Sequence, residues 1–362
     1  MSKLVPVILI ALTPLILLLG LAIGPVFISA EQFFELLPYV FSYQMPAAST
    51  AAQAELASLS IIITDIRLPR TLLAWLIGAA LAISGAAMQG LFRNPLADPS
   101  IIGVTSGASL GASIAVVMLG ASVEQLGGLS MLVLGAFIGG LLAVLLVYSL
   151  STGSGIFSNK FSYNDYSSNG TSVATMLLVG IAITALAGAS NSMLAYISDD
   201  EMLRRLSLWN MGGLDAANGL RVKLALLVIL PAMLLLLGFW RQLDAMLLGE
   251  SEARHLGVDV QRVKWLLIVL VAIAVASSVA LAGVIGFVGL VVPHMLRMLI
   301  GPGHARLLPC SALAGGLLLV AADVLARVVV SPAELPVGVI TAILGAPLFI
   351  VLLRHRRGYG LV

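Results

Sequence analysis

Long runs of apolar residues separated by short polar stretches dominate the pattern of this chain. A run of roughly 17–25 apolar residues is long enough to cross the hydrocarbon core of a membrane as a helix. Strand-like alternation is absent, so the pattern favours helices over a barrel. Eight runs are clear, and two are weaker, because Ile101–Leu119 is rich in Gly and Ser and Ile285–Leu299 is short. The eight clear runs are Leu4–Phe27, Thr71–Phe92, Gly128–Leu150, Val173–Tyr196, Leu224–Trp240, Trp265–Ala282, Leu307–Leu325 and Val337–Leu353.

Four polar stretches interrupt this pattern. Residues 42–60 and 151–170 read as loops. Residues 198–219 hold enough charge and apolar spacing for a short amphipathic helix from Glu201 to Trp209. Residues 241–264 carry charges at helical spacing, followed by a turn punctuated by Gly. The pattern shows no further boundary, so residues 1–362 are interpreted as a single transmembrane domain.

Composition supports the same class of protein. The chain has 362 residues, of which 60% are hydrophobic and 10% are charged, against about 25% charged residues in soluble proteins. The first apolar run exceeds the roughly 7–15 residues of a signal-peptide core, so it is interpreted as a retained helix. The single cysteine, Cys310, allows no disulfide within the chain and is interpreted as a small apolar core residue. A net charge of +2 gives no reason to expect a nucleic-acid partner.

The distribution of Lys and Arg predicts the orientation of the chain. If the N-terminus lies inside and the ten spans alternate, most of the 19 Lys and Arg residues fall on the inside. This agrees with the positive-inside rule. Both termini are therefore predicted to be cytoplasmic, with residues 241–264 inside and residues 198–219 outside.

Candidate catalytic chemistry is missing from the sequence. There is no Gly-Lys dipeptide and hence no phosphate-binding P-loop, and the four histidines have no metal-ligand spacing. Asp323 lies one helical turn from Arg327, which favours an ion pair over a proton relay. An enzyme is therefore not predicted. An ion-driven secondary transporter remains an alternative, although it requires buried acidic residues at mid-membrane that the sequence does not clearly supply.

Four motifs in order carry a resemblance to a known family. They are "RLPRTLLAWLIGAALAISGAAMQGLFRNPLADPSIIGVTSGASLG", "LGESEARHLGV", "ALAGVIGFVGLVVPH" and "AELPVGVITAILGAPLFIVLL". Together they span residues 67–353, nearly the whole chain. They resemble the permease subunits of bacterial ATP-binding-cassette (ABC) importers for iron–siderophores, heme and cobalamin.

The resemblance implies the architecture and the partners of the chain. We expect an all-α, type II importer permease of about ten transmembrane helices in the bacterial inner membrane, surrounded by lipid. Two copies would pair around one central pathway. Two ATPase subunits would bind ATP and Mg²⁺ on the cytoplasmic side, and a periplasmic binding protein would deliver the substrate. The permease itself would be non-catalytic and would bind no cofactor or metal.

The resemblance also implies where the cytoplasmic gate lies. Asn94 and Leu96, in the turn "RNPLADP", match gate positions of the family, and Pro95 and Pro99 would interrupt the helix there. The alternative is that Asn94 belongs to a simple turn between helices. A second gate element, matched from the family's fifth helix, would fall at residues 172–174, which are Ser172, Val173 and Ala174. Two of these three are apolar where small polar residues are expected.

Two further groups of residues are matched to interfaces with partners. In the family, the segment "GESEARHLGV" forms coupling helices that dock on the ATPase. The contact residues expected here are Glu250, Glu252, Arg254 and His255. Periplasmic arginines of the family pair with glutamates of the binding protein, since Arg binds carboxylates in a bidentate manner. The matching residues are Arg67, Arg70 and Arg327.

The substrate is predicted from residues 180–214. This stretch is most similar to that of heme-type permeases, so heme is the expected substrate, with an iron–siderophore or cobalamin as the alternative. No histidine falls on the predicted outer half, so the permease is not expected to ligate iron there. Met193 and Tyr196 would suit a flat apolar ligand if they line the pathway, although ordinary helix packing is an equal alternative.

Overall fold

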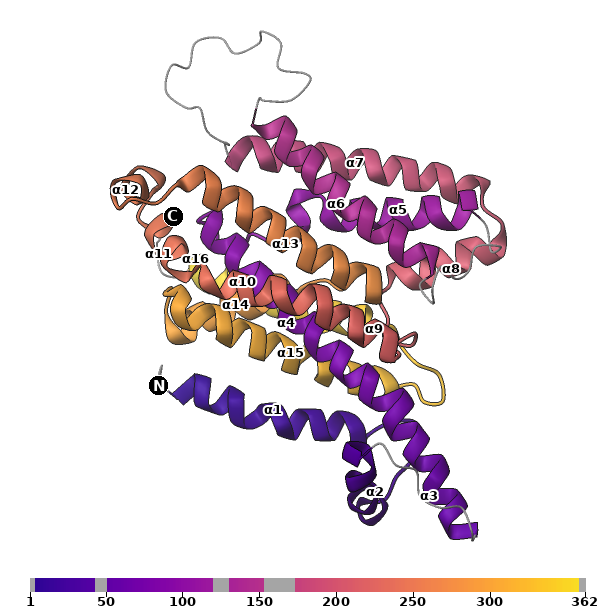
Figure 1. Cartoon of the computed structure of the whole chain (residues 1–362). Helices are drawn as coiled ribbons and strands as arrows, with labels where there is room; N and C mark the ends of the chain where they lie inside the picture. Colours follow the sequence, from indigo (N-terminus) through magenta and orange to yellow (C-terminus); the bar gives the residue numbers. More distant parts are fainter. Residues whose placement is uncertain (1–3, 43–50, 120–129, 153–172, 358–362) are drawn as a thin grey trace.

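Every element of the part of the chain that the structure describes is helical (Figure 1). The computed structural model describes residues 4–42, 51–119, 130–152 and 173–357. The first half contains α1 (Leu4–Ala22), α2 (Ala30–Ser42), α3 (Ala51–Ile61), the π-helical η1 (Ile62–Arg67), α4 (Leu68–Leu91), the 3₁₀ turn η2 (Pro99–Ile102), α5 (Val104–Leu119), α6 (Met131–Ser151) and α7 (Val173–Ile197).

The second half continues with shorter helices between the long ones. It contains α8 (Asp200–Asn210), α9 (Gly219–Leu224), the π-helical η4 (Ala225–Ile229), α10 (Leu230–Gly238), α11 (Trp240–Leu247), α12 (Glu250–His255), α13 (Val260–Ala282), α14 (Val288–Ile300), α15 (His304–Val328) and α16 (Val337–Arg357). The predicted amphipathic helix after residue 198 is present as α8. Asp199 caps it by accepting a hydrogen bond from the Met202 amide.

The described helices include seven that are long and apolar enough to cross a membrane. Three shorter apolar helices, α5, α14 and α16, accompany them. Two of the three correspond to the runs that were weakest in the sequence. The all-helical membrane fold is therefore confirmed, whereas the count of ten spans stays a prediction.

The region before α4 differs from the sequence prediction. Part of the stretch expected to be a loop, residues 42–60, forms α3, which continues through η1 into α4 as one apolar helix from residue 53 to residue 91. Its Ala-rich sequence favours a helix, but its polar residues hid it from a search for apolar runs. A second helix, α2, packs its buried Phe33 and Leu36 with Leu21 of α1, Leu59 and Ile63.

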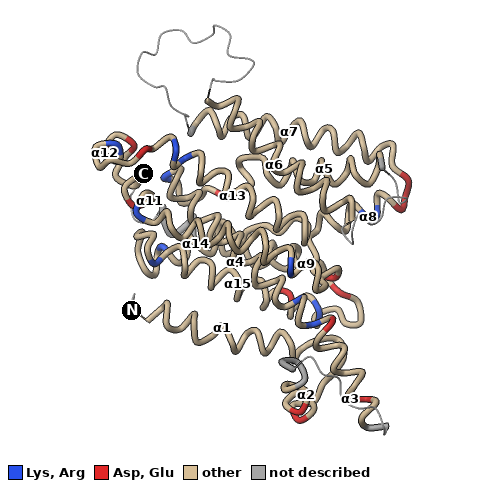
Figure 2. Tube along the Cα trace, viewed as in Figure 1, with Lys and Arg blue, Asp and Glu red and all other residues tan. Residues whose placement is uncertain are grey.

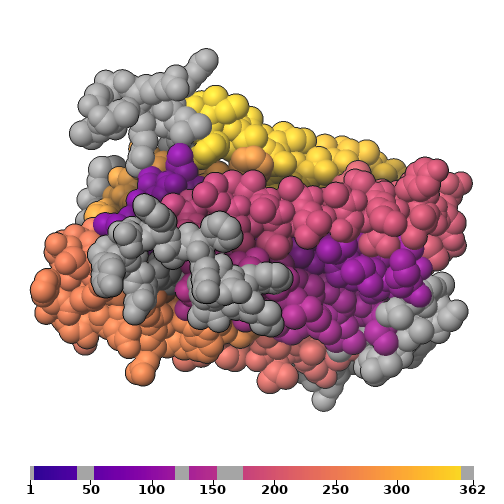
Figure 3. Space-filling model, turned by 90° about the horizontal axis from the view of Figure 1, so that it is seen from above, coloured from indigo at the N-terminus to yellow at the C-terminus, as the bar shows by residue number. Residues whose placement is uncertain are grey.

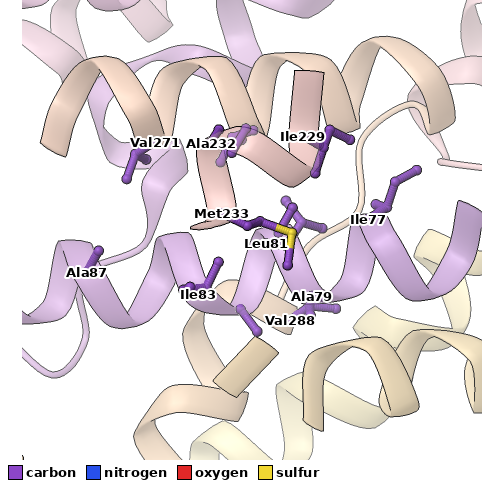
Figure 4. Packing of buried hydrophobic residues seen from close by; sticks show 14 of the residues in the cluster. Ile77, Ala79, Leu81, Ile83, Ala87, Ile229, Ala232, Met233, Val271 and Val288 are labelled. Atoms are coloured by element: carbon purple, nitrogen blue, oxygen red, sulfur yellow. The ribbon is translucent and has the colours of Figure 1, made fainter. Parts of the chain in front are cut away.

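Helix α4 lies at the centre of the bundle, and nearly all of its side chains are buried. It packs against α13, α14 and α15, which come from the other half of the chain. Figure 4 shows Ile77 and Leu81 of α4 beside Ile229 and Met233, while Val288 of α14 lies on the opposite side of the helix. Small residues let the helix backbones approach closely, as is usual for helices packed in lipid.

Two glycines of α4 bring it against its neighbours. A Cβ atom at Gly78 would overlap the carbonyl oxygen of Gly315 in α15, and one at Gly85 would overlap the carbonyl oxygen of Gly289 in α14. At both points one backbone touches another, with no side chain between them. These two glycine contacts therefore set how closely α14 and α15 approach α4.

Charged residues gather at the two ends of the bundle, and the middle is almost free of them (Figure 2). The start of α1 and the end of α16 lie at the same end as α11 and α12 (Figure 1). Helices α2, α3, α8 and α9 lie at the opposite end. That the first end is cytoplasmic and the second periplasmic stays a prediction.

The α4–α14 contact generates a stability prediction. Gly85→Ala should lower the free energy of unfolding by about 1–3 kcal/mol, because a methyl group at a filled backbone contact forces the two helices apart. Gly188→Ala in α7 is the matched control, since a Cβ atom there meets nothing within 4 Å. Thermal unfolding in detergent measures both variants. Equal melting temperatures for Gly85→Ala and Gly188→Ala would contradict this account of the α4–α14 contact.

Candidate functional site: the coupling segment, the gate turn and the buried arginines

The short helix α12 projects from the end of the bundle that carries both ends of the chain. Gly249 precedes it with a φ angle of +129°, a conformation that residues with a side chain rarely adopt. Ala253 is fully buried and anchors the inner face of α12. Glu250 forms a salt bridge of 2.7 Å from its carboxylate to Nζ of Lys264, whose side chain is 2% exposed. The helix is thus attached to the start of α13 through a buried charge.

The four predicted coupling residues fall into two groups. Glu252, Arg254 and His255 are exposed on the outer face of α12. Glu250 is partly buried and bonded to Lys264, so it holds the helix in place instead of projecting outward. The sequence pattern did not identify Lys264 as the partner of Glu250. The edge of a membrane span is nevertheless a common position for a lysine that pairs in this way.

The predicted gate turn joins α4 to η2. The Asn94 amide donates to the Gln89 carbonyl at 3.2 Å, and the Asn94 side-chain oxygen accepts from the Leu96 amide at 3.0 Å. Arg93 adopts a φ angle of +49°, so the chain reverses sharply. Asn94 is exposed and Leu96 is half-buried. The side chain of Asn94 therefore helps to form the turn, as expected if Asn94 belongs to a simple turn between helices. The same side chain is also exposed on the surface of the chain.

Asp98 is a member of this turn that sequence reasoning did not single out. Its carboxylate accepts a hydrogen bond of 2.8 Å from the Ser100 amide and so caps η2. The other carboxylate oxygen faces the start of α14, at the point where a Cβ atom on Gly289 would lie 3.2 Å away. Burial raises the pKa of the Asp98 carboxyl, while the hydrogen bonds from Ser100 act in the opposite direction. The turn is therefore in contact with α14 as well as α4.

The second predicted gate element falls at the start of α7. Ser172 lies outside the described residues, and Val173 begins α7. Ala174, in the first turn of α7, is exposed. This assignment stays a prediction, as does the interpretation of residues 151–170.

Met193 and Tyr196 lie on the outer surface of α7. Their side chains are 71% and 90% exposed, respectively. Figure 3 shows α7 running along one face of the molecule beside α5 and α6. The two residues are therefore not packed inside this chain, and ordinary packing within the bundle does not explain them.

The three predicted docking arginines are buried at the opposite end of the bundle. The Arg67 guanidinium donates to the carbonyl oxygens of Leu21 at 2.9 Å and Ala22 at 2.7 Å, and it also bonds to the carbonyl of Val26. These carbonyls belong to the end of α1 and the residues just after it. Arg67 thus satisfies backbone acceptors that the end of a helix leaves without intrahelical partners.

Arg70 and Arg327 share one buried carboxylate. Nε of Arg70 lies 2.9 Å from Asp323 and its Nη1 lies 2.7 Å from Glu334. Nε of Arg327 lies 3.1 Å from the second oxygen of Asp323, whose side chain is fully buried. The expected ion pair between Asp323 and Arg327 is present. Arg327 also donates to the carbonyl of Gly20 in α1 at 3.1 Å.

The docking role predicted for Arg67, Arg70 and Arg327 stays a prediction, but all three side chains are buried. Their guanidinium groups are used within the chain, so in this structure they are not presented to the carboxylates of another protein. The reason is that membrane-buried charges must be paired inside the protein. The signal available in the sequence was Asp323, one turn from Arg327, but the contribution of Glu334 depends on the connection between α15 and α16.

The ion cluster generates a second stability prediction. Asp323→Asn should lower the free energy of unfolding by about 3–5 kcal/mol, because it leaves buried guanidinium groups without a counter-charge. Glu201→Gln is the control. It breaks an exposed pair of 3.4 Å with Arg205 in α8 and should change stability little. Chemical or thermal unfolding in detergent distinguishes the two, and an Asp323→Asn variant as stable as the wild type would refute the role of the cluster.

Comparison with known proteins places this arrangement in a family. Residues 11–355 match the FecCD transport family. The hemin transport system permease protein HmuU of Yersinia pestis is 47% identical over 81% of this chain and 83% of its own length. The cobalamin import permease BtuC of Halobacterium salinarum is 44% identical over 82% of this chain and 74% of its own length. The vitamin B12 import permease BtuC of Vibrio vulnificus is 41% identical over 81% and 82%, respectively.

A solved structure agrees with the fold over nearly the whole chain. It is an inward-facing ABC transporter assigned to the metal-chelate type, with a TM-score of 0.78 and 33% identity. The match covers 97% of this chain and 99% of that one. Permease subunits of such transporters are non-catalytic, and their partner ATPases hydrolyse the ATP. The chain therefore belongs to the FecCD transport family, as a multi-pass, non-catalytic permease subunit of an ABC importer in the inner membrane.

Proposed function

We propose that this permease moves heme across the inner membrane after receiving it from a periplasmic binding protein. The observation that carries this proposal is the 47% identity to a hemin permease, against 44% and 41% for two cobalamin permeases. The margin is small, so cobalamin is the second candidate, and an iron–siderophore is the third. Membership of the FecCD family sets aside the ion-driven secondary transporter.

The surface of α7 supports a central pathway between two copies of the chain. Thr184, Gly188, Ser192 and Tyr196 follow one another at intervals of four residues, and all are exposed. Small and polar groups at this spacing form a stripe along one face of the helix. Such a stripe gains nothing from contact with lipid. It suits a second copy or a substrate pathway, with Met193 and Tyr196 contacting the flat apolar ligand.

We place the cytoplasmic gate of that pathway at the turn between α4 and α5. Asn94 and Leu96 would be doubled by the two-fold axis of a permease pair, since a two-fold contact brings the same residues together. The outward-facing side chain of Asn94 supports this assignment. Ala174, together with Val173 and Ser172, would supply the second element of the gate.

We place the ATPase contact on α12. Glu252, Arg254 and His255 present both signs of charge on a short, firmly attached helix. The complex would contain two ATPase subunits, which bind the ATP and Mg²⁺. The binding protein would approach the opposite end, where Arg204 and Arg205 of α8 are exposed. We add these two exposed arginines to the candidates for pairing with its carboxylates.

Transport by a reconstituted complex tests the substrate. Vesicles containing the permease, its ATPase and its binding protein should accumulate heme at least tenfold faster than cobalamin or a ferric siderophore. Vesicles without ATP provide the baseline for each compound. Faster uptake of cobalamin than of heme would refute the heme assignment and support the second candidate.

Charge reversal on α12 tests the coupling surface. Glu252→Arg and Arg254→Glu should each lower ATP-driven uptake by at least tenfold, because a like charge at a docking surface repels its partner. Arg262→Glu is the control, since Arg262 is also exposed but lies at the start of α13, outside α12. Uptake and ATP hydrolysis are measured on the same vesicles. If both α12 variants match the control, α12 is not the coupling surface.

A further inference from the structure

An Asp–His pair, with a fully buried histidine and a partly exposed aspartate, lies where α11 meets the start of α15. The carboxylate oxygen Oδ1 of Asp244 lies 2.7 Å from Nδ1 of His304. The same oxygen accepts a hydrogen bond of 2.8 Å from the His304 backbone amide. Asp244 thus caps α15 from another helix, and both bonds involve a charged acceptor, which makes them stronger than neutral hydrogen bonds.

The His304 ring connects this pair to α4. Its side chain is fully buried, and its Nε2 edge faces Gly90, the second-last residue of α4. A Cβ atom on Gly90 would overlap Nε2 of His304 and would lie 3.1 Å from Leu243 of α11. Helices α4, α11 and α15 therefore meet at one point. The absence of a side chain at Gly90 makes the contact possible.

This meeting point is directly joined to the proposed gate. The Gly90 carbonyl accepts a hydrogen bond of 3.2 Å from the Arg93 amide, the first bond of the 93–98 turn. The neighbouring Gln89 carbonyl accepts from Asn94. A displacement of His304 against Gly90 would therefore act on the backbone that shapes the turn.

The pair is also close to the coupling helix along the chain. Asp244 lies in α11, and Gly249 separates α11 from α12. The α11–α12 connection is tight, since the Leu248 amide donates to Ala245 at 3.1 Å and the Gly249 amide donates to Met246 at 3.2 Å. Helix α12 is thus attached to the bundle at two places, by Glu250 to Lys264 and through α11 by Asp244 to His304.

We propose that Asp244 and His304 are positioning residues that transmit movement of α12 to the gate turn, through the contact of the His304 ring with Gly90. The inference rests on the proposed role of α12 as the ATPase contact. Tight packing around the buried His304 ring and two charge-assisted bonds from Asp244 make the connection stiff, so a shift of α11 is passed to α4 instead of being absorbed locally.

The experiment compares variants in the complete complex with heme as the probe. Asp244→Ala removes both hydrogen bonds, and heme imported per ATP hydrolysed should fall at least tenfold, while ATP hydrolysis stays within twofold of wild type. Asp244→Asn should recover coupling to within threefold, because an amide oxygen accepts from the same two donors. Gly90→Ala should uncouple as Asp244→Ala does, although it leaves the carboxylate intact, because the added methyl group displaces the His304 ring.

Asp259→Ala is the matched control. Asp259 also lies next to α12 and accepts a backbone hydrogen bond at the start of a helix, of 3.1 Å from the Arg262 amide, but it is exposed. Its coupling ratio should stay within twofold of wild type. Wild-type coupling in Asp244→Ala or Gly90→Ala would overturn the inference, and so would an equal loss in Asp259→Ala. If the wild-type complex itself imports no heme, cobalamin or siderophore, the proposed function fails instead.

Discussion

Direct contact between helix backbones at α4 is the constraint on which the rest of this structure depends. Gly78 and Gly85 let α15 and α14 lie against α4 with no intervening side chain. Apolar side chains gain little by leaving lipid for another helix, so close packing must supply the cohesion. The almost fully buried α4 then becomes the frame from which the 93–98 turn at one end and the ion cluster at the other both extend.

The ion cluster shows how buried charges are accommodated in this closely packed bundle. Arg70 and Arg327 enter the bundle at the predicted periplasmic end, where Asp323 offers one oxygen to each. Arg67 instead uses the backbone carbonyls at the end of α1. Each guanidinium joins η1, α4 or α15 to another segment, so these charges hold this end of the bundle together.

The opposite end is organised for contact with a partner. Helix α12 exposes charges outward and is attached inward through Glu250 and, by way of α11, through Asp244. The 93–98 turn begins three residues after Gly90, which the His304 ring touches. The proposed ATPase surface and the proposed gate are therefore joined by a short series of packed groups. Such proximity would let an ATPase that never meets the substrate control its path.

Apolar run length, small-residue content and the excess of internal Lys and Arg determined the membrane class, most helices and the expected orientation from sequence alone, because these are local or summed properties. The motif match supplied the family and the exposed residues of α12. Only the tertiary structure decided that Arg67, Arg70 and Arg327 are buried. Their burial depends on carboxylates and carbonyls that are distant in the sequence but close in space. The tertiary structure also decided the Asp244–His304 pair, whose members are 60 residues apart and meet because a glycine on a third helix leaves room for the ring.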